Sequence, residues 1–285
     1  MDKVAIIILN YKLKNLTLKC LTSVLTSSYK NILPIVVDNN SEDGIFESLE
    51  KYQEVEFIQT GGNLGYVGGN NLGIKRALEK GCDFIFILNP DTEITKDTIR
   101  ILLDRAKEYG DGIYGPKIYF GDKKKNSKVI WFAGGKFDKA NVLGSHIGVD
   151  EKDIGRYDKD TDVDFVTGAA MFVSKKVFED IGLLDERYFL YYEDSDFCFR
   201  AKNKGFKIMY IPNSTVYHDN AKATGLGSPL QDYYITRNRM LFASKFLSLR
   251  TQFALIREAI KNISNKTKRK ALYDYLLGNF GKGNI

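Results

Sequence analysis

The chain has 285 residues, enough for one large α/β domain with an appendage or for two small domains. A hydrophobic share of 44% predicts a folded core and excludes a wholly disordered chain. Cys20, Cys82 and Cys198 lie far apart with no CxxC pair, so they favour neither a disulfide framework nor a cysteine-based zinc site, and a reducing cytosol suits them. No apolar run reaches the roughly 18 residues of a membrane span, which argues against a transmembrane helix.

The net charge of +6 is concentrated near the C-terminus. Between residues 233 and 270 ten bases accompany one acid, Glu258, so this segment carries +9 and the remainder of the chain −3. A basic segment of this kind can meet anionic lipid, a lipid-linked diphosphate or nucleic acid, and its plain alternative is a solvated helix face. We expect a cytoplasmic protein with peripheral contact to the inner face of the cell membrane and no nucleic-acid partner.

The first 110 residues alternate between two patterns. Apolar runs predict four buried strands, at residues 4–9, 33–37, 55–59 and 84–88. Helical spacing of apolar residues predicts helices at 16–27, 70–80 and 95–109, with another helix beginning at Ser41 as N-cap. This alternation is typical of a mostly parallel sheet covered by helices on both faces. Polar residues follow the strands at the edge where such sheets bind ligands: Asn10, Asp38, Asn39, Asn89 and Asp91.

The second half has shorter elements. Residues 112–165 indicate a meander with lysine- and glycine-rich turns and a mobile polar tip at 150–164. Order returns at 165–174, and the patterns then predict helices at 176–181 and 195–203 and strands at 206–211 and 214–217. From residue 230 onward the pattern is helical.

Asp91 belongs to an Asn-Pro-Asp-Thr turn directly after an apolar strand. A carboxylate on such a turn projects over the sheet edge, where it can hold Mg²⁺ or Mn²⁺, which prefer oxygen ligands and leave positions open for phosphate. The alternative is a structural turn in which Asp91 caps the next helix, and the segment alone leaves both open.

Glu193, Asp194 and Asp196 place three acids within four residues. Their repulsion raises at least one carboxyl pKa unless cations compensate, and Arg200 lies four residues after Asp196, where it can pair with it. Glu193 or Asp194 then remains to face a cleft as a general base. The alternative is an acidic helix N-terminus favoured by the helix dipole.

His218 ends a short apolar strand and is one of two histidines. Histidine at a strand end can complete a metal site with its second nitrogen held by a carboxylate such as Asp219, although a lone histidine is as often structural.

The segment 61–71 contains five glycines, which let backbone amides approach an anionic ligand. A dinucleotide-binding loop is disfavoured because these glycines follow the third strand instead of the first, and no Walker A sequence is present.

Seven blocks in chain order resemble the family 2 glycosyltransferases, most closely the rhamnosyltransferase-like branch. They are LNYK (9–12), VVDNNSEDG (36–44), NLGYVGGNN (63–71), LNPDT (88–92), TGAAMFV (167–173), DERYFLYYEDSDFCFR (185–200) and YIPNSTVYH (210–218). The segment YYITRNRMLF (233–242) also resembles that branch. The resemblance covers about residues 4–245.

The resemblance implies a GT-A fold: a mostly parallel, Rossmann-like sheet flanked by helices, with a C-terminal helical extension. It implies a catalytic domain at 1–230, made of a nucleotide-binding half (1–110) and an acceptor-binding half (111–230), followed by a basic helical extension at 231–285. It also implies that the nucleotide is bound by residues of the first half, which are Asn10, Tyr11, Asp38, Asn39, Asn63, Gly65, Asn70, Asn89 and Asp91.

The resemblance also makes Asp194 the catalytic base, and Asp91 and His218 the ligands of a divalent metal, Mg²⁺ or Mn²⁺. Asn89 stands where the family's metal motif has its first aspartate, so one carboxylate contact is missing. The expected reaction is inverting transfer of a sugar from dTDP-rhamnose or a UDP-sugar to a saccharide or lipid-linked saccharide, in cell-surface polysaccharide synthesis.

Two other functions fit parts of the sequence less well. A nucleotidyltransferase that makes sugar nucleotides would carry a glycine- and base-rich loop after the first strand, which residues 10–14 lack. A non-catalytic module that binds sugar or nucleic acid could stack bases on Tyr233 and Tyr234, but it leaves the acids at 193–196 without a role.

Overall fold

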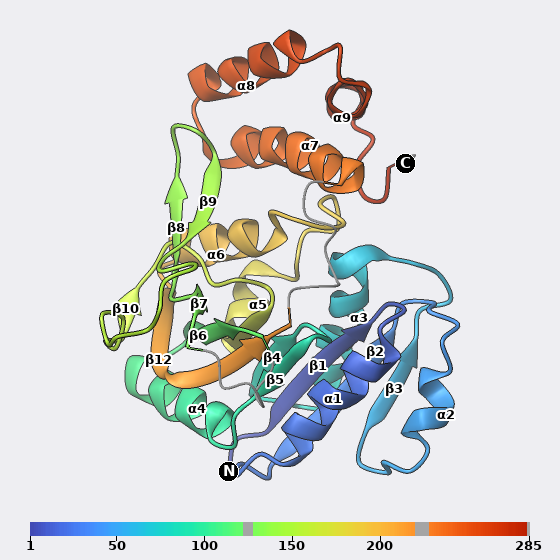
Figure 1. The fold of residues 1–285 in the computed structure, drawn as a ribbon, viewed down its shortest axis with the longest axis vertical. Helices are drawn as coiled ribbons and strands as arrows, with labels where there is room; N and C mark the ends of the chain where they lie inside the picture. The colour runs from blue at the N-terminus through green and yellow to red at the C-terminus, as the bar shows by residue number, and fades with distance from the viewer. Residues whose placement is uncertain (122–127, 220–227, 284–285) are drawn as a thin grey trace.

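The computed structural model describes residues 1–121, 128–219 and 228–283. In these ranges the strands form one large mixed sheet and a separate two-stranded hairpin, with three helices stacked at the C-terminal end (Figure 1). The main strand order is β10-β12-β6-β11-β4-β1-β2-β3, with β5 paired to β12 and β7 paired to β6.

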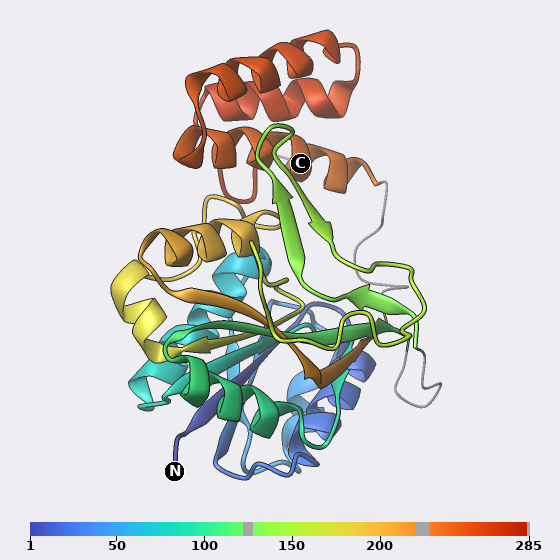
Figure 2. The same ribbon diagram turned by 90° about the vertical axis from the view of Figure 1, so that its left-hand side faces the viewer.

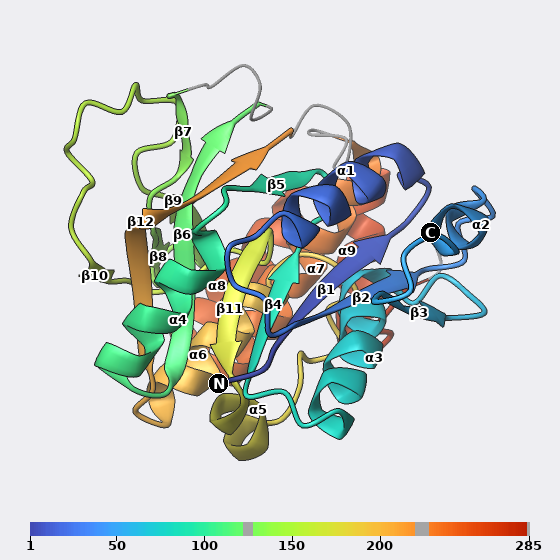
Figure 3. The ribbon, with the colours of Figure 1, turned by 90° about the horizontal axis from the view of Figure 1, so that it is seen from below.

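The first half contributes the parallel part of the sheet. Its strands are β1 (Val4–Asn10), β2 (Ile32–Asp38), β3 (Glu56–Gln59) and β4 (Phe84–Leu88). Its helices are α1 (Lys14–Leu25), α2 (Ile45–Leu49), α3 (Gly65–Glu79) and α4 (Thr98–Tyr109). The four strands lie side by side in Figure 3, with α1 drawn across them. Every residue of β1 is buried, because helices cover it and strands flank it on both sides.

The second half extends this sheet with strands of both directions. Its strands are β5 (Thr92–Ile94), β6 (Gly112–Phe120), β7 (Ile130–Phe132), β10 (Thr161–Asp162), β11 (Ala170–Ser174) and β12 (Lys207–His218). Strand β11 is antiparallel to both β4 and β6, whereas β12 is parallel to β6. Helices α5 (Lys175–Ile181) and α6 (Glu193–Asn203) follow in this half.

A hairpin connects the sheet with the C-terminal helices. Strands β8 (Gly135–Asp138) and β9 (Leu143–His146) rise from the sheet toward α7 (Pro229–Phe246), α8 (Leu249–Lys261) and α9 (Lys266–Leu276), as Figure 2 shows. At its tip the Arg239 guanidinium of α7 donates to the carbonyl oxygen of Asn141 at 2.6 Å. The hairpin therefore contacts the helical end directly.

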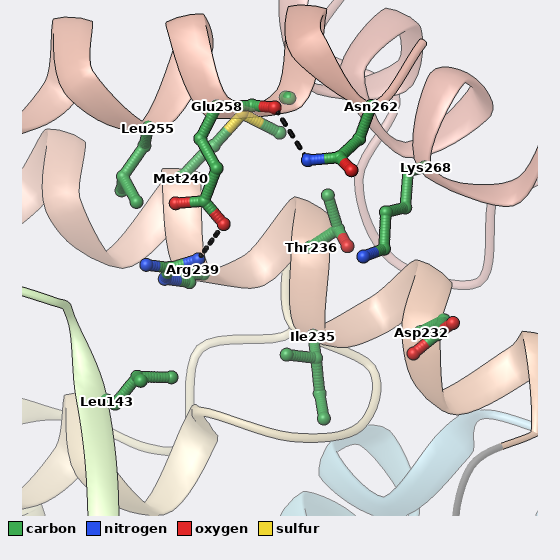
Figure 4. Close-up of a pocket in the computed structure, with 11 residues that line it drawn as sticks. Leu143, Asp232, Ile235, Thr236, Arg239, Met240, Leu255, Glu258, Asn262 and Lys268 are labelled. Carbon is green, nitrogen blue, oxygen red and sulfur yellow. Dashed lines mark hydrogen bonds and ion pairs between the residues drawn. The ribbon is translucent and has the colours of Figure 1, made fainter. Parts of the chain in front are cut away.

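A small cavity of about 130 Å³ lies among α7, α8, α9 and Leu143 of β9 (Figure 4). Arg239 and Glu258 form an ion pair of 2.9 Å across it, and Asn262 donates to the Glu258 carbonyl oxygen at 2.9 Å. Its lining includes neither the acids at 193–194 nor His218, so it is distinct from the site described below.

Several boundaries differ from the sequence-based expectation. The two strands predicted at 206–211 and 214–217 are one strand, β12, with an irregularity between Ile211 and Thr215. Helix α2 has Gly44 as its N-cap instead of Ser41, whose hydroxyl instead accepts from the Lys12 amide. Strands β5, β8, β9 and β10 were not predicted. Part of the lysine-rich turn, 122–127, lies outside the described residues.

The polar segment 150–164, expected as a mobile tip, is tied back to the sheet. The Lys117 ammonium of β6 is buried and pairs with Asp153 at 2.8 Å and with Asp158 at 2.5 Å. Tyr210 of β12 donates to the Tyr157 carbonyl oxygen at 3.0 Å. In the described part of the chain no helix is long and apolar enough to cross a bilayer.

Candidate active site

A cleft of about 590 Å³ opens where the parallel strands end and the second half of the chain folds over them. It brings together Asn89 after β4, His218 at the end of β12, and Glu193 and Asp194 at the start of α6. Residues up to 129 positions apart in sequence, Asn89 and His218, thus share one hollow.

Asp91 and His218 form a buried pair beside this cleft. The His218 Nε2 atom lies 3.1 Å from Asp91 Oδ1, and both side chains are almost inaccessible to solvent. The antiparallel pairing of β5 with β12 places His218 opposite Thr92, one residue after Asp91. The Asp219 amide also donates to the Asp91 carbonyl oxygen at 2.9 Å. The predicted pairing of the second histidine nitrogen with the Asp219 carboxylate is wrong, because Nδ1 has no hydrogen-bond partner.

Buried polar atoms without a partner cluster in this part of the molecule. Within the described residues they are Asn70 Oδ1, Asp91 Oδ2, Glu193 Oε2 and His218 Nδ1. Buried polar atoms in folded proteins nearly always have partners, so such a concentration points to an ion or ligand that satisfies them. Asp91 and His218 supply an oxygen and a nitrogen donor that suit a divalent cation. No group of three or more candidate metal-binding side chains is found in the described ranges.

Asp194 is held by backbone amides. Its Oδ2 accepts from the Gly168 amide at 3.1 Å, and its Oδ1 accepts from the Ser195 amide at 2.6 Å. Burial raises the pKa of Asp194 above its ordinary value, and these hydrogen bonds oppose that rise. Asp196, by contrast, is completely buried and pairs with Arg200 at 2.7 Å, as the spacing predicted. The acids at 193 and 194 are therefore the ones that face the cleft.

Trp131 and His146 also line the cleft, and the sequence did not single them out as site residues. Trp131 meets both histidine rings edge-on, with ring centroids 4.4 Å from His218 and 4.5 Å from His146. Burial lowers the pKa of His146 to about 4, so its imidazole is neutral near pH 7. The available signal was composition, since Trp131 is the single tryptophan of the chain and His146 one of two histidines.

The polar residues after β1 and β2 form a network of their own. The Asn10 amide donates to Asp38 at 2.8 Å and to the Ser41 hydroxyl at 3.0 Å, while its oxygen accepts from Thr17 at 2.8 Å. Asn10 and Asp38 are buried, whereas Tyr11 is 41% exposed. Asp38 lines a hollow of about 340 Å³ beside β2. Asn10 thus supports Asp38, which borders an accessible surface.

Asn39 connects this network with the glycine-rich segment. Its side chain donates to Asn63 Oδ1 and to the Gly65 carbonyl oxygen, both at 3.1 Å, and accepts from the Leu64 amide at 2.8 Å. Asn70 is fully buried and donates to the Tyr66 carbonyl oxygen at 2.9 Å. Helix α3 begins at Gly65 instead of the predicted residue 70, so most of these glycines are helical.

The glycines inside α3 serve packing more than ligand approach. A Cβ on Gly73 would lie 2.7 Å from Ile7 of β1, and one on Gly69 would overlap Leu9. The absence of side chains therefore lets α3 approach β1 closely.

The sequence matches the family model described as glycosyl transferase family 2 over residues 4–182. The chain belongs to this family. The chain is 31% identical to the low-salt glycan biosynthesis hexosyltransferase Agl10 of Haloferax volcanii, across 87% of this chain and 78% of that one. It is 29% identical to the dTDP-rhamnosyl transferase RfbF of Shigella flexneri, across 92% and 90%. It is 26% identical to an N-acetylglucosaminyl-diphospho-decaprenol L-rhamnosyltransferase of Mycobacterium tuberculosis, across 72% of each.

Solved structures share the fold of this glycosyltransferase. The mannosyltransferase PcManGT of Pyrobaculum calidifontis, in complex with GDP-Man and Mn²⁺, superposes with a TM-score of 0.61 at 13% identity, covering 100% of this chain and 76% of that one. Staphylococcus aureus TarS 1–349 with UDP-GlcNAc gives 0.60 at 15% identity, covering 96% and 71%. The expected GT-A fold and the rhamnosyltransferase-like resemblance are confirmed.

Proposed function

We propose that this glycosyltransferase moves a sugar from a nucleoside-diphosphate donor to an acceptor hydroxyl with inversion at the anomeric carbon. The observation that carries the proposal is one cleft lined by both Asp194 and His218, with Asp91 of the first half paired to His218 beside it. A base on one side and a site for the leaving diphosphate on the other suit direct displacement, which needs no covalent enzyme intermediate.

A divalent cation, Mg²⁺ or Mn²⁺, completes this proposal. A nucleoside diphosphate leaves poorly until its charge is neutralised, and a bound cation would supply that neutralisation. Asp91 and His218 are the residues proposed to hold it, because each has a buried donor atom without a partner. Asn89 lines the same cleft and adds no charge to it.

Asp194 is the proposed base. The amides of Gly168 and Ser195 fix its carboxylate, and its raised pKa increases its affinity for the acceptor's proton relative to an ordinary aspartate. We assign to the nucleoside side the connected residues Asp38, Asn39, Asn63 and Gly65, with exposed Tyr11 beside them and buried Asn10 as their internal support. Asn70, which is buried in α3 and donates to the Tyr66 carbonyl oxygen, is assigned to the same side.

The proposed donor is dTDP-rhamnose or a UDP-sugar, and the proposed acceptor is a saccharide or a lipid-linked saccharide. The names of the relatives favour rhamnose, and one of those relatives acts on a decaprenol-linked diphosphate sugar. Helix α8 supports the lipid-linked alternative, since exposed Leu249, Phe253 and Ile260 lie on it beside the exposed bases Arg250, Arg257 and Lys261. We infer peripheral contact of this helix with an anionic membrane surface.

The test is a donor panel in which release of dTDP or UDP is measured with and without Mn²⁺ or Mg²⁺. Asp194→Asn is expected to lower kcat by roughly 10²–10⁴-fold while nucleotide affinity is kept, because only proton transfer is lost. Asp91→Asn is expected to abolish the metal-dependent part of nucleotide binding, measured by thermal shift. Asp194→Asn with the wild-type rate would show that Asp194 is not the base, and stabilisation by NAD alone would contradict the assigned reaction.

A further inference from the structure

The loop that leads into the acidic motif has an unusual backbone. Phe189, Tyr191 and Tyr192 have φ values of 64°, 68° and 74°, in the left-handed region that residues other than glycine rarely adopt. Each such conformation is strained and persists only where neighbouring groups hold it. Tyr192 is the N-cap of α6, so this backbone sets where Glu193 and Asp194 begin.

Helix α7 supplies the groups that hold the loop. The side-chain amide of Asn238 lies 3.0, 2.8 and 2.9 Å from the carbonyl oxygens of Tyr188, Leu190 and Tyr191, respectively. Arg237 donates to the same Tyr188 carbonyl at 3.1 Å, and its Nε donates to Asn238 Oδ1 at 3.0 Å, which fixes the orientation of the amide. Both side chains are completely buried.

The opposite side of the loop contacts the nucleotide-side segment. The Val67 amide of α3 donates to the Phe189 carbonyl oxygen at 3.2 Å, and the Phe189 ring lies directly against Gly65. The same ring stacks on Tyr234 of α7, with centroids 5.3 Å apart. The loop therefore packs between α7 and the start of α3, with contacts to both.

Simple packing does not explain this choice of residues. A buried guanidinium is costly unless its charge is compensated. Arg237 donates to carbonyl oxygens, to Asn238 and to the Tyr233 hydroxyl, and it lies over the rings of Tyr233 and Tyr234. Apolar residues would fill the same space without that cost. Hydrogen-bond donors such as these side chains, unlike apolar groups, fix the position of the backbone that they contact.

We propose that Arg237 and Asn238 of α7 are positioning residues, which set the carboxylate of Asp194 through the backbone of the loop at 187–192. The inference rests on the proposed role of Asp194 as base and adds to it a dependence on the C-terminal helices. It makes α7 part of the catalytic machinery although neither residue lines the cleft.

The test compares Asn238→Leu with Met240→Leu, a volume-conserving change at a buried position of the same helix that lines the cavity among α7, α8 and α9. Asn238→Leu is expected to lower kcat at least about tenfold while the KM for donor and the Kd for UDP or dTDP stay within about threefold, because misplacing a catalytic group affects the reaction step. Met240→Leu is expected to keep the wild-type kcat. Asn238→Ser, which retains one donor, should give an intermediate kcat and is the variant to measure if Asn238→Leu does not fold.

An unchanged kcat in folded Asn238→Leu or Asn238→Ser would overturn the inference. A parallel loss of kcat and nucleotide affinity would do so as well, because it would indicate general destabilisation. The proposed function is tested separately: if Asp194→Asn is inactive and the Asn238 variants are fully active, the base assignment stands and the positioning role fails.

Discussion

Glu193 is a buried acid beside the proposed base, and its Oε2 atom has no hydrogen-bond partner. Burial, followed by the neighbouring charge of Asp194, raises the pKa of Glu193 well above its ordinary value of 4.5. Below that ordinary value the residue is protonated in both the folded and the unfolded chain. Above it only the unfolded chain releases the proton, so the free energy of unfolding falls by about 1.4 kcal/mol per pH unit until the folded pKa is reached.

Glu193→Gln removes this penalty and keeps the shape of the protonated acid. The variant is expected to be more stable than wild type near pH 7, with a difference in Tm that shrinks toward zero as the pH falls to about 4. Thermal melts between pH 4 and pH 8 would measure it, with the exposed Glu50→Gln as a control whose difference should not vary with pH. A Glu193→Gln difference that is constant across this range would show that Glu193 is ionised in the folded chain.

The sequence pointed to the candidate catalytic and metal-binding residues of the cleft, but not to the aromatic residues that line it. Asp91, Asp194 and His218 follow strand ends or begin a helix, so local pattern marked them as candidates, and the family resemblance gave each its expected role. In the structure Asp194 and His218 line one cleft, with Asp91 paired to His218. Trp131 and His146 could not be selected this way, because they reach the cleft only through the pairing of β7 with β6 and through the β8–β9 hairpin. Those contacts depend on chain pairing that no local signal encodes.

At the scale of elements, the N-terminus of α3 combines a backbone requirement with a close contact. Gly65 has a φ of 73°, and a Cβ there would lie 2.5 Å from the Phe189 ring and 2.6 Å from its carbonyl oxygen. Gly62, three residues earlier, has no heavy atom within 4 Å of a built Cβ and no positive φ. Gly62 is therefore a suitable control position for a substitution of Gly65.

Gly65→Ala is expected to lower the free energy of unfolding by roughly 1–3 kcal/mol, from the strained φ and the contact with Phe189. Gly62→Ala is expected to change it by no more than about 0.5 kcal/mol. Urea unfolding of both variants would measure the difference. Equal effects at the two positions would mean that the loop at 187–192 can move away from α3 without cost.

The elements that were predicted correctly share a physical cause. Strands β1, β2 and β4 are buried on both faces, so burial produces an unbroken apolar run. Strand β5 has three residues and exists through its pairing with β12, and β9 is mostly exposed, so neither leaves such a run. The start of α3 was misplaced because its glycines resemble a loop, whereas they permit close packing on β1.

At the scale of the whole molecule, the six bases that the C-terminal segment carries on α7 and α8 divide into two sets. The bases of α7 bind other parts of the protein. Arg237 donates to the loop before α6, and Arg239 pairs with Glu258 and donates to the Asn141 carbonyl oxygen. Lys245 pairs with Asp185 at 2.7 Å. Arg250, Arg257 and Lys261 are exposed on α8 and line one shallow hollow together with Phe253. The net charge of the segment is therefore larger than the positive charge that is free to contact a membrane.

The exposed set still suffices for membrane contact, because each base near an anionic surface contributes about 1 kcal/mol and the apolar side chains Leu249 and Phe253, both 68% exposed, add buried area. Replacing Arg250, Arg257 and Lys261 by Gln is thus expected to weaken co-sedimentation with anionic vesicles by about 100-fold at low salt. Phe253→Ser should weaken it at every salt concentration, since the apolar contribution is not screened.

Ile154→Ser is the matched control for this experiment, because Ile154 is 67% exposed but lies in the polar segment tied to β6. It should bind vesicles like wild type, and all variants should keep their activity on a water-soluble acceptor, since α8 does not line the cleft. Binding that is unaffected by the α8 changes would place any membrane contact elsewhere. Loss of binding together with loss of activity on the water-soluble acceptor would instead show that the helical end is needed for the fold of the cleft.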